Sequence, residues 1–295
     1  MIYKGEIGPI PIAVKRWDGG RNYQGEKQFL TELQVLFEYK HENIIGLVGY
    51  CNENNEKILV YEYASNGSLD KHLNDATLTW TQRLKIGIDI ATGLEFLHGG
   101  GSPVIHVDIK SSNILLTGDW NGKIADFGLS MITVMDKEID FVVDAACGTL
   151  GYIDPLVRNQ GFFTRESDIY SLGVVLFEMM CGTFAYLKNN EDEERFLGPF
   201  VKLYYEEGKA DELVFEGIKN KIVPNSLTTF QRIAYQCLSD VREERPSASE
   251  VVLQLKKALE FQVICLLFLH KLMFFSHMIT RISIRQIMNQ ETHTQ

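Results

Sequence analysis

Two short groups of polar residues near the middle of the chain have the composition needed for chemistry on phosphate. The first is the run HVDIKSSN, which ends at Asn113, and the second is the tripeptide DFG, which begins at Asp126. Asp108 could accept or orient the proton of a hydroxyl nucleophile, and Lys110 could neutralise charge on the transferred group. Asn113 and Asp126 supply oxygen ligands of the kind that magnesium prefers. Either group alone is weak evidence, because a single aspartate in a loop usually forms a cap or a turn.

Hydrophobic periodicity predicts short strands and one helix before these groups. Apolar runs indicate strands at Ile10–Val14, Ile44–Gly49 and Ile58–Tyr63. Polar residues 51–56 indicate a turn between the last two strands. Glu26–Tyr39 has apolar residues at helical spacing, which predicts an amphipathic helix.

Beyond Asn66-Gly67 the pattern is mainly helical. Thr81–His98 keeps its apolar residues on one face, and the glycines that follow predict its end. Ser167–Cys181 is apolar nearly all round, which predicts a buried central helix. The charged segment Asn189–Arg195 predicts a solvated loop. A small strand-rich part followed by a larger helix-rich part predicts two lobes with a cleft between them.

The composition is that of a soluble globular protein and disfavours several classes. The chain has 295 residues, and 39 acidic against 29 basic side chains give a net charge of −10, which disfavours a nucleic-acid binder. The five cysteines are scattered without any C-x-x-C pair, so they predict neither a zinc site nor a disulfide framework and fit a reducing compartment. The N-terminus lacks the apolar core of a secretory signal.

The order of the two polar groups resembles that of the eukaryotic protein kinases. HVDIKSSN resembles the catalytic loop H-R-D-x-K-x-x-N, and DFG resembles the magnesium-binding tripeptide of that family. The resemblance implies catalytic roles for Asp108, Lys110 and Asn113. It also implies that Asn113 and Asp126 hold Mg²⁺ or Mn²⁺ and that ATP is the phosphate donor. Three neighbours have structural roles in such a family member: His106, Phe127 and Gly128.

The resemblance extends to the residues that would bind ATP. The end of the strand at Lys15 resembles the family's strand lysine, which holds the α- and β-phosphates, and Glu32 resembles its ion-pair partner. Tyr61 resembles the residue at the back of the adenine pocket. Glu62 and Ala64 resemble the hinge, whose backbone hydrogen-bonds adenine.

Further motifs resemble the plant receptor-like serine/threonine kinases, in the family's order. They are Phe29–Glu32, His41–Ile45, Leu47–Cys51, Leu59–Tyr63, Asn66–Leu69, Asp89–Ala91, Gly148–Tyr152, Ser167–Ser171 and Arg245–Ser247. The resemblance implies the α+β, two-lobed kinase fold over about residues 2–262, with an N-lobe of about 2–64 and a C-lobe of about 65–262. Thr149 resembles the threonine of the substrate-docking loop. Asp168 resembles the helix carboxylate that anchors the catalytic loop, and a simple helix N-cap is the less favoured alternative.

Three features depart from the family pattern. The sequence given begins after the place of the glycine-rich loop G-x-G-x-x-G-x-V and its strand, so we expect weaker nucleotide binding and an exposed strand edge. Val107 replaces the arginine that normally pairs with a phosphorylated activation-loop residue, which puts activation by loop phosphorylation in doubt. Leu156 replaces the glutamate that pairs with the arginine at Arg245. We therefore expect Arg245 to use Glu243, Glu244 or water, and we expect Leu156→Glu to raise the melting temperature.

The function implied is an ATP-dependent serine/threonine kinase of the receptor-like type that phosphorylates protein substrates in signalling. Receptor or co-receptor kinases are possible further partners. A truncated, pseudokinase-like binding module or dominant-negative partner is the alternative, and a small-molecule phosphotransferase is a poor third. The resemblance implies an intracellular location, in the cytoplasm or on the cytoplasmic face of the plasma membrane.

Residues 263–295 form a tail whose composition differs from that of the rest of the chain. Val263–Ile279 is mostly apolar but contains His270, Lys271 and His277. A central lysine costs about 2.5–3.5 kcal/mol in a membrane-spanning helix. Three interpretations stay open: a spanning helix, a helix that binds a membrane surface or a partner, and a non-native segment from a gene-model or splicing irregularity, which is slightly favoured.

Overall fold

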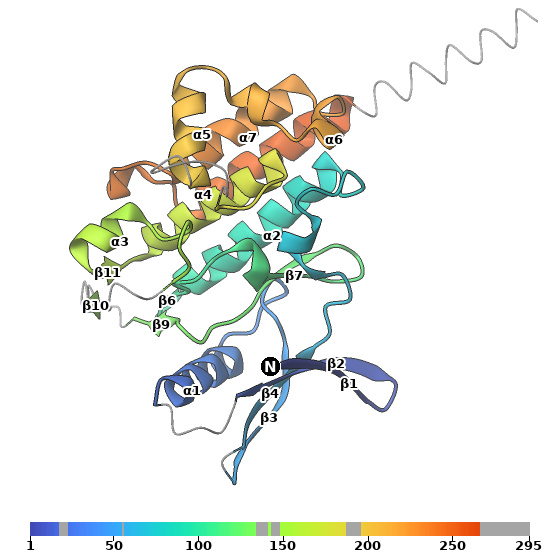
Figure 1. Ribbon diagram of the computed structural model, residues 1–295, viewed down its shortest axis with the longest axis vertical. Helices are drawn as coiled ribbons and strands as arrows, with labels where there is room; N and C mark the ends of the chain where they lie inside the picture. Colours follow the sequence, from blue (N-terminus) through green and yellow to red (C-terminus); the bar gives the residue numbers. More distant parts are fainter. Residues whose placement is uncertain (18–22, 55, 134–140, 143–147, 187–195, 266–295) are drawn as a thin grey trace, which may run out of the picture.

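The computed structural model describes residues 1–17, 23–54, 56–133, 141–142, 148–186 and 196–265, and it shows a small and a large lobe (Figure 1). The small lobe contains an antiparallel sheet with the strand order β1-β2-β4-β3. Its strands are β1 (Ile2–Ile7), β2 (Ile10–Trp17), β3 (Leu47–Glu53) and β4 (Glu56–Glu62). Helix α1 (Tyr23–Glu38) packs against β3 and β4. Strand β1 therefore forms one edge of this sheet.

The large lobe is built around helix α4 (Arg165–Cys181), whose side chains from Ser167 to Met180 are all buried. Helices α2 (Trp80–His98), α5 (Leu197–Glu206) and α7 (Pro224–Cys237) pack against α4. Residues 248–265 are also helical. Because α4 is covered on all sides, its sequence has no polar face, as the periodicity predicts.

Shorter elements connect these helices. They are β5 (Gly67–Ser68), η1 (Leu69–His72), β6 (Val104–Ile105), η2 (Ser111–Asn113), β7 (Ile114–Leu116), β8 (Gly122–Ile124), β9 (Met131–Ile132), β10 (Phe141–Val142), α3 (Pro155–Gln160), β11 (Phe162–Phe163), η4 (Ala210–Leu213), α6 (Glu216–Lys219) and η5 (Arg242–Glu244). Four of them, β5, η1, η2 and β7, contribute residues to the space between the lobes. The pairs are β5-β7-β8, β6-β9 and β10-β11, all antiparallel.

The α+β, two-lobed architecture predicted from the sequence is confirmed, with small differences at element ends. Helix α2 begins at Trp80, where Thr79 and Gln82 form a capping box, and it ends before Gly99 as expected. The strand predicted at residues 44–49 begins only at Leu47, because Ile44 forms a bridge with Ile124 of the large lobe. The turn predicted at residues 51–56 was too long: positions 51–53 continue β3.

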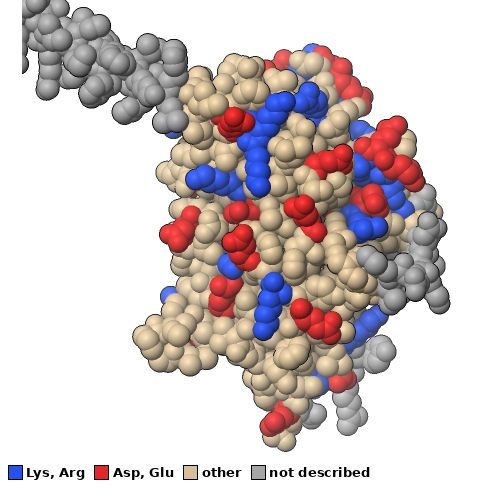
Figure 2. All heavy atoms as spheres, turned by 180° about the vertical axis from the view of Figure 1, so that it is seen from behind, with Lys and Arg blue, Asp and Glu red and all other residues tan. Residues whose placement is uncertain are grey.

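Several sequence predictions fall outside the described residues. They include the charged loop at 189–195 and the tail from residue 266 onward. Within the described part of the chain, no helix combines the length and the apolar character needed to cross a bilayer. On the face shown in Figure 2, acidic and basic side chains are interspersed over the described surface, so the charge excess does not form one continuous field there.

Candidate active site between the lobes

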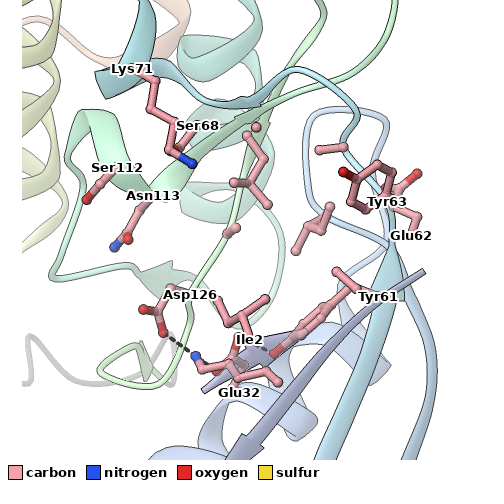
Figure 3. A pocket seen from close by; sticks show the side chains of 17 residues that line it. Ile2, Glu32, Tyr61, Glu62, Tyr63, Ser68, Lys71, Ser112, Asn113 and Asp126 are labelled. Carbon is pink, nitrogen blue, oxygen red and sulfur yellow. Dashed lines mark hydrogen bonds and ion pairs between the residues drawn. The ribbon is translucent and has the colours of Figure 1, made fainter. Parts of the chain in front are cut away.

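A cleft of about 470 Å³ lies between the two lobes and is lined by residues from both. The small lobe contributes Ala13 and Lys15 of β2 and Glu32 of α1, and the large lobe contributes Asn113 and Asp126. In Figure 3, Asn113 and Asp126 lie on one side of the cleft, whereas Tyr61, Glu62 and Tyr63 lie along the other. The cleft is therefore the place where elements distant in the sequence meet.

Lys15 joins the small lobe to the start of the DFG tripeptide. Its Nζ lies 2.7 Å from Glu32 Oε2 and 2.7 Å from Asp126 Oδ1. Glu32 is 1% exposed because it lies on the same face of α1 as the buried Phe29. The hydroxyl of Tyr61 donates to Glu32 Oε1 at 2.8 Å, so both carboxylate oxygens of Glu32 have partners. Sequence analysis predicted that Lys15, Glu32 and Asp126 share one cleft, but it did not predict the hydrogen bond from Tyr61 to Glu32.

The electrostatics of this group keep Lys15 and Asp126 charged. Burial alone would lower the pKa of Lys15, but Glu32 and Asp126 outweigh it and raise that pKa above its ordinary value. Burial alone would raise the pKa of Asp126, but the Lys15 ammonium outweighs it, so the pKa of Asp126 is lowered. A charged lysine beside a charged aspartate is the arrangement needed to hold phosphate oxygens and a metal ion together.

Asp108 lies at the centre of a second group, in the large lobe. Lys110 Nζ donates to Asp108 Oδ2 at 2.6 Å and to Thr149 Oγ1 at 2.7 Å. Thr149 Oγ1 donates to Asp108 Oδ1 at 2.7 Å. Asn113 Nδ2 donates to the main-chain oxygen of Asp108 at 2.9 Å and to Oδ2 at 3.1 Å. The structure therefore brings the predicted catalytic residues and the predicted substrate-loop residue into direct contact.

The backbone of this loop is held by Asp168 of α4. Its Oδ2 accepts from His106 N at 2.7 Å and its Oδ1 accepts from Val107 N at 2.9 Å. His98 at the end of α2 places its Nε2 2.9 Å from Asp168 Oδ2. Asp168 therefore does not act as a simple helix cap, since its carboxylate links two helices to the loop that carries Asp108.

His106 and Phe127 fix the relation between the loop and the DFG tripeptide. Nδ1 of His106 accepts from Asp108 N at 3.2 Å, and Nε2 donates to Ala125 O at 3.2 Å. Complete burial lowers the pKa of His106, so the ring is neutral and can make both bonds. The Phe127 ring meets it edge-on, with centroids 4.9 Å apart. Gly128 lies against α1: a Cβ there would be 3.2 Å from Gln28 Cβ.

The predicted hinge forms one wall of the cleft. The carboxylate of Glu62 accepts from Gly46 N at 2.7 Å and pairs with Lys123 at 2.9 Å, so this side chain has partners within the fold, whereas the predicted hinge role concerns the backbone. The carbonyl of Ala64 accepts from Gly67 N at 3.1 Å. Among the described residues, the N–H of Ala64 has no protein acceptor, which leaves it available to a ligand.

The predicted partners of Arg245 are wrong. Its Nη1 and Nη2 donate to the two oxygens of Asp154 at 2.7 and 2.9 Å, rather than to Glu243 or Glu244. Asp154 also caps α3 by accepting from Leu156 N at 2.9 Å. A bidentate pair is thus present although Leu156 occupies the place of the family's glutamate.

Several lining residues were missed by sequence analysis. Lys71 and Ser68 come from the short η1 and β5 segments, which are too short to show any periodicity. Leu115 also lines the cleft, and its place in the strand directly after Asn113 could have indicated it. Lys71 is exposed and its side chain reaches toward Ser68 at the rim in Figure 3.

The donor set suits a hard divalent cation that is shared with phosphate. Asp126 offers a carboxylate that is 49% exposed, and Asn113 uses its amide nitrogen on Asp108, which leaves the amide oxygen for a metal. In the described part of the chain, no group of three or more His, Cys, Asp or Glu side chains could hold a metal by itself. Magnesium commonly binds through one or two carboxylates plus substrate phosphates, so the residues present fit that ion.

Comparisons with known proteins agree with this geometry. The family model described as "Protein kinase domain" matches residues 9–255. The chain is 40% identical over 266 residues to receptor-like protein kinase HERK 1 of Arabidopsis thaliana, covering 88% of this chain and 32% of that protein. It is 38% identical over 269 residues to receptor-like protein kinase FERONIA of the same plant, covering 88% of this chain and 30% of that protein.

The chain spans about a third of the length of these curated relatives. The family match covers most of the chain, including the cleft, the loop around Asp108 and the DFG tripeptide. The chain therefore belongs to the protein kinase domain family, and its relatives are receptor-like kinases of plants.

Proposed function

We propose that this domain transfers the γ-phosphate of ATP to serine or threonine hydroxyls of protein substrates. The observation that carries the proposal is the joint arrangement of two groups: Asp108 with Lys110, Thr149 and Asn113, and Asp126 with Lys15. Together they supply a proton acceptor, cations for the phosphates and oxygen ligands for a metal. The family match and the kinase names of the relatives support the same function.

The proposed roles follow from the charges of the described residues. Ala64 and its neighbours in the hinge receive adenine, and Lys15, held by Glu32, binds the α- and β-phosphates. Asp126 and Asn113 hold Mg²⁺ or Mn²⁺, which supplies charge neutralisation at the phosphates when bound. These assignments rest on the family template and on the cleft geometry.

Asp108 would orient the attacking hydroxyl. A carboxylate offers about four acceptor sites, and Thr149, Lys110 and Asn113 occupy three, so one site remains for the substrate hydroxyl. The hydroxyl oxygen attacks the γ-phosphorus, the bond to the β-phosphate oxygen breaks, and the hydroxyl proton moves toward Asp108. Lys110 stands beside this carboxylate and stabilises charge on the transferred group.

The decisive experiment measures phosphate transfer from labelled ATP to a serine- or threonine-containing protein, with magnesium present. Asp108→Asn keeps the size of the side chain but weakens proton acceptance, and we expect a loss of at least about 100-fold, the usual range for removing a general base. Asp119→Asn, in the turn before β8, is a matched control outside the cleft and should retain the wild-type rate. Equal transfer by wild type and Asp108→Asn would contradict the proposal.

Neither comparison favours the alternative of a non-catalytic binding module. We extend the proposal to location and partners. The domain lies inside the cell, in the cytoplasm or at the cytoplasmic face of the plasma membrane. It acts on protein substrates, and receptor kinases are possible further partners. The receptor-like names of the relatives support this extension.

A further inference from the structure

Three residues of the large lobe form one rim of the cleft, and none of them has a role in the reaction described above. Ser68 belongs to β5, Lys71 belongs to η1, and Ser112 belongs to η2. All three line the cleft, and Figure 3 shows them grouped with Asn113 at one end of it. We call Ser68, Lys71 and Ser112 the lysine rim.

The lysine rim lies beside the loop that carries Asp108. The η1 segment packs against η2, and β5 pairs with β7, the strand directly after Asn113. Thr149 also contacts Asp108, but it is not among the residues that line the cleft. A substrate chain that brings a hydroxyl to Asp108 therefore has the Thr149 loop on one flank and the lysine rim on the other.

The ammonium group of Lys71 is exposed and has no counter-ion in the described part of the chain. Its Nζ extends over Gly67, 3.7 Å from the place that a Cβ on this glycine would take. The neighbouring Asp70 does not neutralise it, because Asp70 turns its Oδ1 into the lobe, where that atom is buried. The hydroxyls of Ser68 and Ser112 also lack partners among the described residues and can donate hydrogen bonds.

The carboxylates that line the cleft are paired elsewhere. Glu32 and Asp126 both bond Lys15, and Glu62 pairs with Lys123. The lysine rim thus offers one positive charge and two hydroxyl donors, without a competing carboxylate. A cation with neighbouring hydrogen-bond donors is suited to an anionic side chain, because such charge-assisted bonds are stronger than neutral ones.

The rim is also apart from the group that would hold the phosphates of ATP. In Figure 3, Lys71 and Glu32 lie at opposite ends of the cleft, and Glu32 is the partner of Lys15. A charge at the outer rim, beside the catalytic loop, is better placed to meet the protein substrate than the triphosphate.

We propose that Lys71 is a specificity-determining residue, which favours protein substrates with an aspartate or glutamate close to the acceptor serine or threonine. The proposal rests on the kinase function proposed above and names the class of substrate that its site accepts best. The substrate carboxylate pairs with the Lys71 ammonium, and the hydroxyls of Ser68 and Ser112 donate to the same carboxylate. A basic side chain in this place is disfavoured, because it faces a like charge.

Peptides with a single serine test this preference. The reference peptide has only neutral residues around the serine, and its relatives carry one glutamate or one lysine at successive positions on either flank. With saturating ATP and magnesium, glutamate on one flank should raise kcat/KM about twofold to fivefold above the reference, the usual range for one exposed ion pair. Lysine at the same position should lower kcat/KM by a similar factor.

Lys71→Glu reverses the charge of the rim at an exposed position, so the variant should fold and should prefer the lysine peptide to the glutamate peptide. Lys257→Glu is the matched control: it changes the net charge equally, on an exposed position of the helix at residues 248–265 that does not line the cleft. It should keep the wild-type order of peptides. The wild-type preference should also shrink at about 1 M salt, where screening acts within about 3 Å.

Two results would overturn the proposal. The first is the same order of peptides in Lys71→Glu as in the wild type. The second is a change in the KM for ATP that is equal with every peptide, because Lys71 would then act on the nucleotide instead of the substrate.

Peptide binding separates this proposal from the proposed function. If transfer does not depend on Asp108, the kinase function fails, and fluorescence anisotropy of the labelled glutamate peptide with wild type and Lys71→Glu still tests the rim. If transfer depends on Asp108 and neither flank responds to Lys71→Glu, only the proposal for the lysine rim fails.

Discussion

At the scale of single residues, Glu178 is a buried carboxylate outside the cleft whose pKa is shifted toward neutral pH. It is fully buried in α4, and its Oε1 accepts from Tyr152 at 2.6 Å and from Ala185 N at 2.8 Å. Its Oε2 is buried without a partner among the described residues. Burial raises the pKa of Glu178 to about 7, so near neutral pH the side chain is partly protonated.

This raised pKa predicts a pH-dependent stability. From its ordinary value of 4.5 up to about 7, the unfolded state loses the Glu178 proton while the folded state keeps it. The free energy of unfolding therefore falls as pH rises through this window, by up to about 3 kcal/mol, and is unaffected by this group above it. Glu178→Gln keeps an oxygen acceptor for Tyr152 and Ala185 but cannot titrate.

Urea unfolding from about pH 5 to pH 8 would measure the effect. We expect the wild type to lose stability relative to Glu178→Gln across this range, whereas Glu95→Gln, on an exposed position of α2, should follow the wild type. Parallel curves for wild type and Glu178→Gln would show that Glu178 does not carry the proton.

At the scale of elements, the pair between Asp154 and Arg245 fixes the start of α3 against the loop before the last described helix. Both side chains are nearly fully buried, and the two direct bonds are bidentate. Removing one partner of such a pair leaves a buried charge and costs about 3–5 kcal/mol. The departure at Leu156 therefore does not imply an unpaired arginine.

Asp154→Asn tests this pair because asparagine is as good a helix cap as aspartate. We expect a loss of about 3–5 kcal/mol in unfolding free energy, measured by thermal and chemical denaturation. Leu156→Glu should give no gain in melting temperature, because both Nη atoms of Arg245 already donate to Asp154. A clear gain from Leu156→Glu, or a negligible loss from Asp154→Asn, would contradict this account.

The same pair shows where sequence reasoning reaches its limit. Helices α2 and α4 could be predicted because periodicity and capping are local, and the ordered motifs indicated which residues share the cleft. The partner of Arg245 lies 91 residues away, and only the tertiary structure selects it among the nearby carboxylates. Val107 is a similar case, because a single departure from a motif does not reveal the apolar surroundings that accommodate it.

At the scale of the whole molecule, the lobes are joined by more than the hinge. Ile45 N donates to Ile124 O at 2.9 Å, and Ile124 N donates to Asn43 O at 2.8 Å, so the chain after α1 is bonded to β8. One apolar core includes Phe29 of the small lobe and Leu172 of the large lobe. Residues on both sides of the cleft are thus parts of one packed structure.

A ligand in the cleft should therefore stabilise the whole domain. A nucleotide that binds only the folded state, at 100 times its dissociation constant, adds about 2.7 kcal/mol. Melting temperatures with a non-hydrolysable ATP analogue, with and without Mg²⁺, would measure this gain.

Asp126→Asn should lose the extra increment due to Mg²⁺ while it keeps the increment due to the nucleotide, because the hinge and Lys15 remain in place. Asp211→Asn, in η4 of the large lobe and outside the residues that line the cleft, should keep both. An equal Mg²⁺ increment in Asp126→Asn and the wild type would mean that Asp126 does not hold the metal.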